Sequence, residues 1–432
     1  MELIEKILCE ENLQKAIRKV KKNKGAPGVD KMTVQEVEEW FNQYKEDLIS
    51  KILNKQYKPM PVKRVYIPKP NGKQRPLGIP TVVDRVIQQA MLQVLSEIYE
   101  PVFSEHSYGF RPNRSAHMAM EEVLGYLNDG YEWIVDLDIE KFFDTVNHDK
   151  LISILRERVN DSKTLHLIRA YLQAGILDKG LVSSSTIGTP QGGPISVILS
   201  NIYLDKFDKE LESRNLRFAR YADDCIIFVK SEMSANRVMK SVTSWLERKL
   251  FLKVSATKTK VVRPTKGQFL GFTFYKARIV WKCTPTKDRK KRLYSNIQKY
   301  LERKHAASRP LSVTFEKLNQ MIRGWIQYFK ISSIKVFLEE FGQWLRHKVR
   351  CIIIKQWKRP RTIYKNLMKL NIACRYKFTH DDIFKCANSR LGWYRRSTGN
   401  IVNFLLSPTV LGIKKGDRPG LVNPLIYYLE IL

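Results

Sequence analysis

Two adjacent acids lie between apolar runs in residues 218–229, which read Phe218-Ala219-Arg220-Tyr221-Ala222-Asp223-Asp224-Cys225-Ile226-Ile227-Phe228-Val229. The pattern predicts a strand, a tight turn and a second strand, with both acids at the tip of the turn. Because neighbouring carboxylates repel each other, the pair favours a cation site. Such oxygen ligands suit Mg²⁺ held together with substrate phosphates. Taken alone, the tetrapeptide also fits a plain polar turn with solvated acids.

A second acidic strand is predicted upstream, at residues 133–139. Apolar residues alternate there with Ile134, Asp136 and Asp138, so the two acids share one face. A buried strand with two acids on one face is costly unless another group pairs with them. Asp138 lies at the end of this strand, which is where α/β folds place functional groups.

Two further stretches suit anionic ligands. Residues 62–79 predict a hairpin whose basic residues can close over a triphosphate or merely protect a sheet edge, and these residues are Lys63, Arg64, Lys69, Lys73 and Arg75. Residues 188–196 form a Gly- and Pro-rich loop ahead of the apolar helix 197–204. That helix start can bind an anion, or it can be a helix start and nothing more.

The charge of the chain is strongly positive, at +33 over 432 residues. Residues 281–432 hold 32 Lys and Arg against 9 Asp and Glu, so +23 of this charge lies in the last third. Charge of this size destabilises a compact chain through self-repulsion unless a polyanion offsets it, and solubility requires far less. Nucleic acid is therefore the expected partner.

The pattern from about Thr284 onward predicts helices only. The apolar positions from Leu318 to Phe329 have helical spacing and are interpreted as core. A basic stretch follows, with Trp344 and Trp357 interspersed. Basic residues mixed with aromatic residues suit RNA, which offers both phosphates and bases that stack.

The chain has the features of an intracellular protein. No apolar run reaches the length of a membrane span, and the start resembles no secretory signal. The six cysteines are scattered and predict neither a zinc site nor a disulfide framework. We expect a cytoplasmic protein of a prokaryote, without a membrane partner.

Together, these stretches resemble the reverse transcriptases encoded by group II introns. The resemblance covers nearly the whole chain and is carried, in order, by Lys69 with Arg75, Ser107-Tyr108-Gly109-Phe110-Arg111-Pro112, Asp138 with Phe143, Thr189-Pro190-Gln191-Gly192-Gly193-Pro194, Tyr221-Ala222-Asp223-Asp224, Lys258-Thr259, Phe269-Leu270-Gly271-Phe272 and Arg323-Gly324-Trp325-Ile326-Gln327-Tyr328-Phe329. Two departures stand out. Ser255 occupies a position that is usually Asn, and no Cys/His pairs of a zinc-bound endonuclease follow, which fits the compact class without that domain.

The resemblance implies an α+β fold of the right-hand polymerase type. Its fingers and palm contain an antiparallel sheet, and an all-helical thumb or maturase domain follows. The expected domains are an N-terminal helical extension at 1–60, fingers and palm at 61–283, the thumb or maturase domain at 284–400, and a short C-terminal tail at 401–432.

The resemblance also implies an RNA-directed DNA polymerase with a two-metal mechanism. Asp138, Asp223 and Asp224 are the catalytic acids. Asp138, Asp223 and the Ile139 carbonyl hold two Mg²⁺ ions, for which Mn²⁺ can substitute. Phe143 would clash with a 2′-hydroxyl and so select deoxynucleotides. The residues expected at the deoxynucleotide are Lys69, Arg75, Ile139, Phe143, Gln191 and Lys258.

The expected partners are the intron RNA, the RNA template with its DNA primer, target DNA and dNTPs; the oligomeric state stays open. Nucleic-acid contacts are expected at Arg64, Arg111, Arg114, Gly192, Lys290, Lys291, Arg346, Arg350, Lys358, Arg359 and Arg361. Two alternatives remain open. One is an RNA-binding splicing factor without polymerase activity, although the three acids are present. The other is a defence-associated reverse transcriptase derived from this family.

Overall fold

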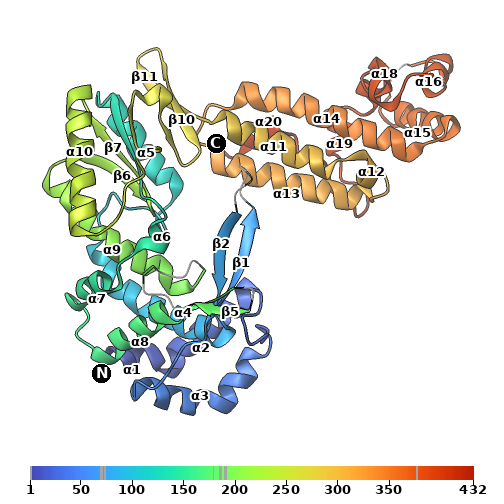
Figure 1. Cartoon of the computed structure of the whole chain (residues 1–432). Helices are drawn as coiled ribbons and strands as arrows, with labels where there is room; N and C mark the ends of the chain where they lie inside the picture. Colours follow the sequence, from blue (N-terminus) through green and yellow to red (C-terminus); the bar gives the residue numbers. More distant parts are fainter. Residues whose placement is uncertain are drawn as a thin grey trace. The chain divides into compact units, whose positions relative to one another are not determined.

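In the computed structural model, a turn at Ala222 and Asp223 joins β6 and β7, which are labelled in Figure 1. These strands belong to a four-stranded antiparallel sheet with the order β6-β7-β3-β8. The strands are β3 (Trp133–Asp138), β6 (Arg217–Tyr221), β7 (Asp224–Val229) and β8 (Lys260–Val262). Helix α10 (Glu232–Lys249) packs against β3 and β7, and α5 (Ala116–Asn128) packs against β6. Both strands and the turn predicted at residues 218–229, and the strand predicted at 133–139, are confirmed. Of the two acids predicted at the tip of the turn, only Asp223 lies there, because Asp224 begins β7 and pairs with Tyr221.

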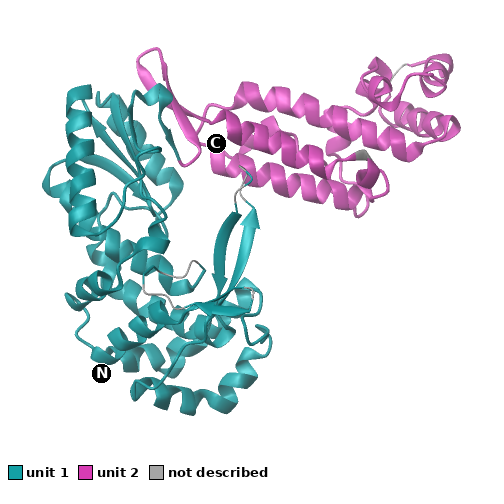
Figure 2. Ribbon diagram, viewed as in Figure 1, with its two compact units in different colours: residues 1–269 teal, residues 270–432 magenta. Residues whose placement is uncertain are grey.

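The structure describes residues 2–68, 72, 74–178, 180–183, 187–188, 192–375 and 378–432, with the side chain of Arg303 left out. They fall into two compact units, Met1–Phe269 and Leu270–Leu432 (Figure 2). Among the described residues, no helix combines the length and the apolar composition that a membrane crossing needs.

A second sheet in the first unit contains the predicted basic hairpin. Its order is β2-β1-β4-β5, formed by β1 (Val62–Pro68), β2 (Gln74–Ile79), β4 (Ile176–Asp178) and β5 (Leu181–Ser183). Strands β1 and β2 pair antiparallel, whereas β1 and β4 pair parallel. The short strands β4 and β5 were not predicted, and the parallel pair makes this sheet mixed.

Helices surround the two sheets of the first unit. Helices α1 (Leu3–Leu8) and α2 (Glu10–Asn23) pack on α4 (Val82–Tyr99), which also packs on α9 (Pro194–Ser213). The unit also contains α3 (Val37–Leu53), η1 (Glu100–Val102), α6 (Phe142–Thr145) and η2 (Pro264–Lys266). The helical stretch predicted at 148–175 is two helices, α7 (His148–Arg156) and α8 (Ser162–Gln173), because the Asp161 carboxylate caps α8 by accepting the Lys163 N–H at 2.9 Å.

The second unit begins with an antiparallel hairpin of β10 (Phe272–Ala277) and β11 (Val280–Pro285). The rest of the unit is helical, as predicted: α11 (Lys287–Tyr300), α12 (Arg303–Ala306), α13 (Leu311–Phe329), α14 (Lys335–Trp357), α15 (Pro360–Ala373), α16 (His380–Ala387), α17 (Trp393–Arg396), α18 (Asn400–Leu405), α19 (Pro408–Gly412) and α20 (Pro424–Glu430). Leu318, Ile322, Ile326 and Phe329 of α13 are buried, as the apolar stripe predicts.

The last residues of the chain belong to the core of the second unit. Helix α20 packs against α13 and α14, and the Tyr428 hydroxyl donates to the Ser332 carbonyl at 2.7 Å. The Asn319 side chain donates to the Gly420 carbonyl and accepts from the Val422 N–H. Residues 401–432, expected as a short tail, therefore fold back onto the helices.

Candidate active site

The register of β3 and β7 brings the predicted acids together, since Asp138 lies directly opposite Asp224. The backbone of Asp138 bonds toward β8: its N–H donates to the Thr259 hydroxyl at 3.2 Å, and its carbonyl accepts from the Ser255 N–H at 2.9 Å. Asp138 and Asp224 are therefore a non-hydrogen-bonded pair of the β3–β7 ladder, in which opposite side chains lie closest and share one face.

A left-handed residue closes the turn that carries the other acid. Ala222 has φ 59°, a conformation that a small residue adopts more readily than a bulky one. Gly109 packs directly beneath it, because a Cβ at Gly109 would lie 2.2 Å from the Ala222 nitrogen. Only glycine therefore allows residues 107–111 to approach the turn this closely.

The acids at this position repel one another. Burial, followed by the negative charges of Asp136, Asp223 and Asp138, raises the pKa of Asp224 to about 7. Lysines face the two acids of β3, Asp136 and Asp138. The Lys258 ammonium lies 2.9 and 3.0 Å from the two Asp138 oxygens, and the Lys260 ammonium lies 3.5 Å from Asp136. The site is thus an acidic face that positive charge stabilises.

The Ile139 carbonyl belongs to the same edge. Hydrogen bonds on either side of Ile139 run toward residues 253–255, from Glu140 N–H to the Lys253 carbonyl at 2.8 Å and from Ser255 N–H to the Asp138 carbonyl. Because backbone groups alternate in direction along a strand, the Ile139 carbonyl points the other way, to the side of the β6–β7 turn. Ser255 supports the Lys258 loop through its backbone, since its carbonyl accepts from Thr259 at 2.9 Å.

The donor set suits a hard divalent cation, because it combines carboxylates with a backbone carbonyl and relieves their repulsion by binding positive charge. Within the described residues, His, Cys, Asp and Glu side chains form no group of three or more arranged to hold a metal ion. The cation that faces Asp138 in this structure is the Lys258 ammonium.

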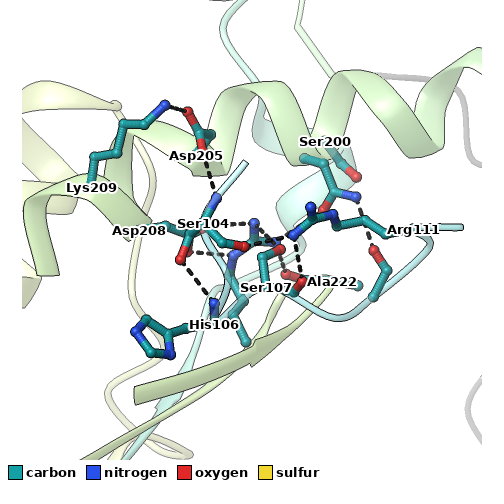
Figure 3. Close-up of polar contacts among 12 residues, drawn as sticks. Ser104, His106, Ser107, Arg111, Ser200, Asp205, Asp208, Lys209 and Ala222 are labelled. Atoms are coloured by element: carbon teal, nitrogen blue, oxygen red, sulfur yellow. Dashed lines mark hydrogen bonds and ion pairs between the residues drawn. The ribbon is translucent and has the colours of Figure 1, made fainter. Parts of the chain in front are cut away.

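A buried ion pair holds the turn from below (Figure 3). The Arg220 side chain is 1% exposed and that of Asp208, on α9, is 0% exposed. Two parallel hydrogen bonds of 2.6 and 2.5 Å join them. The same guanidinium donates to the Ala222 carbonyl at 2.8 Å and to the Ser107 hydroxyl at 2.8 Å. Arg220 therefore ties the turn to α9 and to the segment around Ser107.

A second arginine fixes that segment, and this corrects one prediction. Arg111, expected to contact nucleic acid, is 8% exposed, and its guanidinium donates to the carbonyls of Ser104 and Ser107 at 2.6 and 2.8 Å (Figure 3). It also pairs with Glu100 at 3.0 Å. Because these groups inside the protein occupy the donors of Arg111, its guanidinium supports the segment under the turn and is not available to a phosphate.

Two glycines of the predicted nucleotide-contacting stretch, Gly188 and Gly192, lie close to the backbone of other predicted site elements. Gly188 lies against the backbone of Phe143 and Asp144, and its carbonyl contacts His148 Nε2 at 2.6 Å. Gly192 has φ 128°, and a Cβ there would lie 2.2 Å from the Gly78 carbonyl of β2. Phe143 is half-buried, packed edge-on against Phe142 with ring centroids 5.2 Å apart. Lys69 and Gln191 lie outside the described residues.

The remaining basic residues, of which Arg75 was predicted to bind the deoxynucleotide and the others to contact nucleic acid, differ in accessibility. Arg75, Lys291, Lys358, Arg359 and Arg361 are exposed, whereas Arg64, Arg114 and Arg346 are partly buried. Arg114 forms an ion pair with Glu105, and Lys290 lies over the Phe337 ring at 5.2 Å.

Arg350 is the second correction. It is 8% exposed and donates to the Leu406 carbonyl at 3.0 Å and to Asn403. Burial, followed by the nearby Arg346 charge, lowers the pKa of Arg350 to about 10. Its role is to hold α18 against α14.

Sequence reasoning missed Arg220, Asp208 and Gly109 as parts of the site. The sequence shows Arg220 next to the turn and Asp208 on a helix with many apolar residues. An acid that is buried requires a partner, so Asp208 could have indicated an ion pair. The pairing itself joins residues on separate elements and has no local pattern.

Comparisons with known proteins show which families the chain is similar to. Residues 67–274 match the family described as reverse transcriptase (RNA-dependent DNA polymerase), and residues 278–371 match the group II intron, maturase-specific domain. Protein YkfC of Escherichia coli is 34% identical over 317 residues, which cover 64% of this chain and 83% of YkfC.

Two further relatives are matched over smaller shares of their length. The group II intron-encoded protein LtrA of Lactococcus lactis is 39% identical over 206 residues, 47% of this chain but only 34% of LtrA. A chain of the partial Cas6-RT-Cas1–Cas2 complex is 26% identical, with a TM-score of 0.38, and the match covers 57% of this chain and 43% of that one.

The buried pair yields a stability prediction. Asp208→Ala leaves the Arg220 charge buried without its partner and is expected to lower the free energy of unfolding by about 3–5 kcal/mol. Arg220→Met combined with Asp208→Leu should cost less than Asp208→Ala, because no charge is stranded. As a control, Lys206→Ala breaks an exposed pair with Glu157 and should change stability by about 1 kcal/mol or less. Thermal unfolding followed by circular dichroism measures all three, and equal effects of Asp208→Ala and Lys206→Ala would contradict the assignment.

Proposed function

The chain belongs to the family of reverse transcriptases and maturases encoded by group II introns, and on this premise we propose how its residues copy RNA into DNA and bind the intron RNA that the protein helps to splice. The observation that carries the proposal is the alignment of Asp138 opposite Asp224, at the end of two paired strands and beside the Asp223 turn. An acidic face of this kind stabilises bound cations and, through them, a triphosphate.

Asp138, Asp223 and the Ile139 carbonyl would hold two Mg²⁺ ions, with Asp224 adjacent. When bound, these ions supply activation of the primer 3′-hydroxyl and neutralisation of the leaving pyrophosphate. In this structure the Lys258 ammonium contacts both Asp138 oxygens. If Asp138 held Mg²⁺ instead, Lys258 would be free to contact the incoming nucleotide, where the family resemblance places it.

Other side chains would orient the nucleotide. Arg75 lies opposite Ile67 on the β1–β2 hairpin and is exposed, so its guanidinium can reach an anionic ligand. Phe143 lies shortly after Asp138 in the sequence, in the short helix α6. Its ring would lie against the sugar of the nucleotide, where a 2′-hydroxyl would clash with it. Lys69 and Gln191 stay predictions for the same ligand.

The second unit would bind structured RNA. Lys358, Arg359 and Arg361 are exposed where α14 ends and α15 begins, and Lys291 is exposed on α11. Exposed cations at this density favour phosphate contacts, which fix the position of an RNA without reading its sequence. The same charge suits the target DNA of a mobile intron.

Removing one acid of the turn tests the polymerase proposal. Asp223→Asn keeps the size of the side chain but loses its charge, so primer extension on an RNA template with dNTPs and Mg²⁺ should fall more than about a hundredfold, since cation-mediated stabilisation is worth several kcal/mol. Asp149→Asn, an exposed acid paired with Arg169, should extend primers like the wild type. Undiminished extension by a folded Asp223→Asn protein would refute the proposal.

Phe143 gives a separate test of sugar selection. Phe143→Ala removes the ring and should raise incorporation of ribonucleotides relative to deoxynucleotides by about ten- to hundredfold, the range that one pocket contact supplies. Phe143→Tyr keeps the ring and should keep the discrimination. The ratio is measured by single-nucleotide extension with dNTP or NTP, and an unchanged ratio in Phe143→Ala would exclude the gate.

A further inference from the structure

Phe110 presents an aromatic ring to solvent from a strained backbone. Its φ is 62°, a left-handed value that bulky residues rarely adopt, and its side chain is 53% exposed. The strain is therefore not offset by burial of the ring. Backbone strain of this kind persists where the surroundings enforce it, and it gathers at functional sites.

The residues on both sides of Phe110 are fixed. The Gly109 carbonyl accepts from the buried Asn201 amide at 2.9 Å, and Gly109 packs against the Ala222 nitrogen of the catalytic turn. On the other side, the Arg111 guanidinium is bound by the carbonyls of Ser104 and Ser107. Neither neighbour can turn to draw the ring inward, so the fold holds Phe110 in the open.

The ring is directed to one particular neighbour. Its centroid lies 6.3 Å from that of Tyr221, at an interplanar angle of 46°, which is within the range of a favourable aromatic pair. Tyr221 is the last residue of β6, two positions before Asp223. A half-exposed aromatic pair thus lies beside the acids, with nothing in the described fold for the outer face of Phe110 to cover.

We propose that Phe110 stacks on the 3′-terminal nucleotide of the primer, with Tyr221 behind it. The inference rests on the proposed polymerase function, because the reacting 3′-hydroxyl must then lie at the acids of the turn. The nucleotide that carries this hydroxyl is the one within reach of a ring beside Tyr221. Stacking of a base on an aromatic side chain tolerates every base, so Phe110 would hold the primer end without sequence preference.

Phe251 provides a matched control within the same unit. It has nearly the same backbone strain and exposure, with φ 54° and 58% of its side chain exposed. Its neighbour Leu250, however, accepts a hydrogen bond from Tyr203 at 2.5 Å at the end of α10. Phe251→Ala therefore removes an exposed, strained ring at the end of α10, on a different segment from the one that packs against Ala222.

The test uses a primer whose 3′-terminal base is 2-aminopurine, annealed to an RNA template, because stacking quenches the fluorescence of this base. The wild type should quench it, and Phe110→Ala should abolish the quenching and weaken primer–template binding about five- to hundredfold. Phe110→Gly also removes the ring, and it relieves the backbone strain at φ 62°. A loss of quenching in this variant therefore comes from the missing ring and not from misfolding. Phe110→Trp and Phe251→Ala should both quench like the wild type.

Primer extension in the same samples separates two failures. Extension by the wild type with unchanged quenching in Phe110→Ala and Phe110→Gly overturns the stacking inference and leaves the polymerase intact. Equal loss of quenching in Phe251→Ala overturns it as well, because the effect would then not depend on the turn. Absence of extension by the folded wild type overturns the proposed function, and the inference with it.

Discussion

Asp138 and Asp224 face each other across the β3–β7 ladder, and the register of the two strands gives them no other position. Like charges directly opposite in a sheet destabilise it. Burial, followed by the negative charges of Asp136, Asp223 and Asp138, raises the pKa of Asp224 to about 7. The two lysines of the region reduce the repulsion by pairing with Asp138 and Asp136. On our proposal this acidic face would hold cations, and the positive groups that face it in the structure are Lys258 and Lys260.

The surroundings of the turn serve to keep this unfavourable arrangement in place. Arg220 on β6 and Arg111 on the neighbouring segment 104–111 are both buried, and these bonds join them to six groups: three carbonyls, one hydroxyl and two carboxylates. Gly109 allows that segment to contact Ala222 closely. A rigid support of this kind is what precise positioning of catalytic groups requires, and it leaves Phe110 exposed beside the acids.

The sequence predicts the parts of this site that follow from local pattern. The patterns at 133–139 and 218–229 predict the strands and place Asp138 at a strand end, as the structure confirms. They also place both Asp223 and Asp224 in the turn, whereas Asp224 belongs to β7. The sequence does not predict that Arg111 and Arg350 are buried, because burial of a basic side chain depends on how the backbone folds to bring carbonyls to its donors. Arg111 meets carbonyls only seven and four residues away, at Ser104 and Ser107. Arg350 meets Leu406 and Asn403, more than fifty residues away. The strands β4 and β5 have three residues each, too few for a periodicity to be recognised.

Binding of Mn²⁺ followed by electron paramagnetic resonance tests the central claim, that the opposed acids form a cation site, most directly. The sample holds the protein, an RNA template with a chain-terminated primer, and the next dNTP, so that no turnover occurs, and the nucleotide alone is the blank. The account predicts two Mn²⁺ bound per protein beyond the blank, and fewer in Asp138→Asn. Equal Mn²⁺ binding by wild type and Asp138→Asn would contradict it.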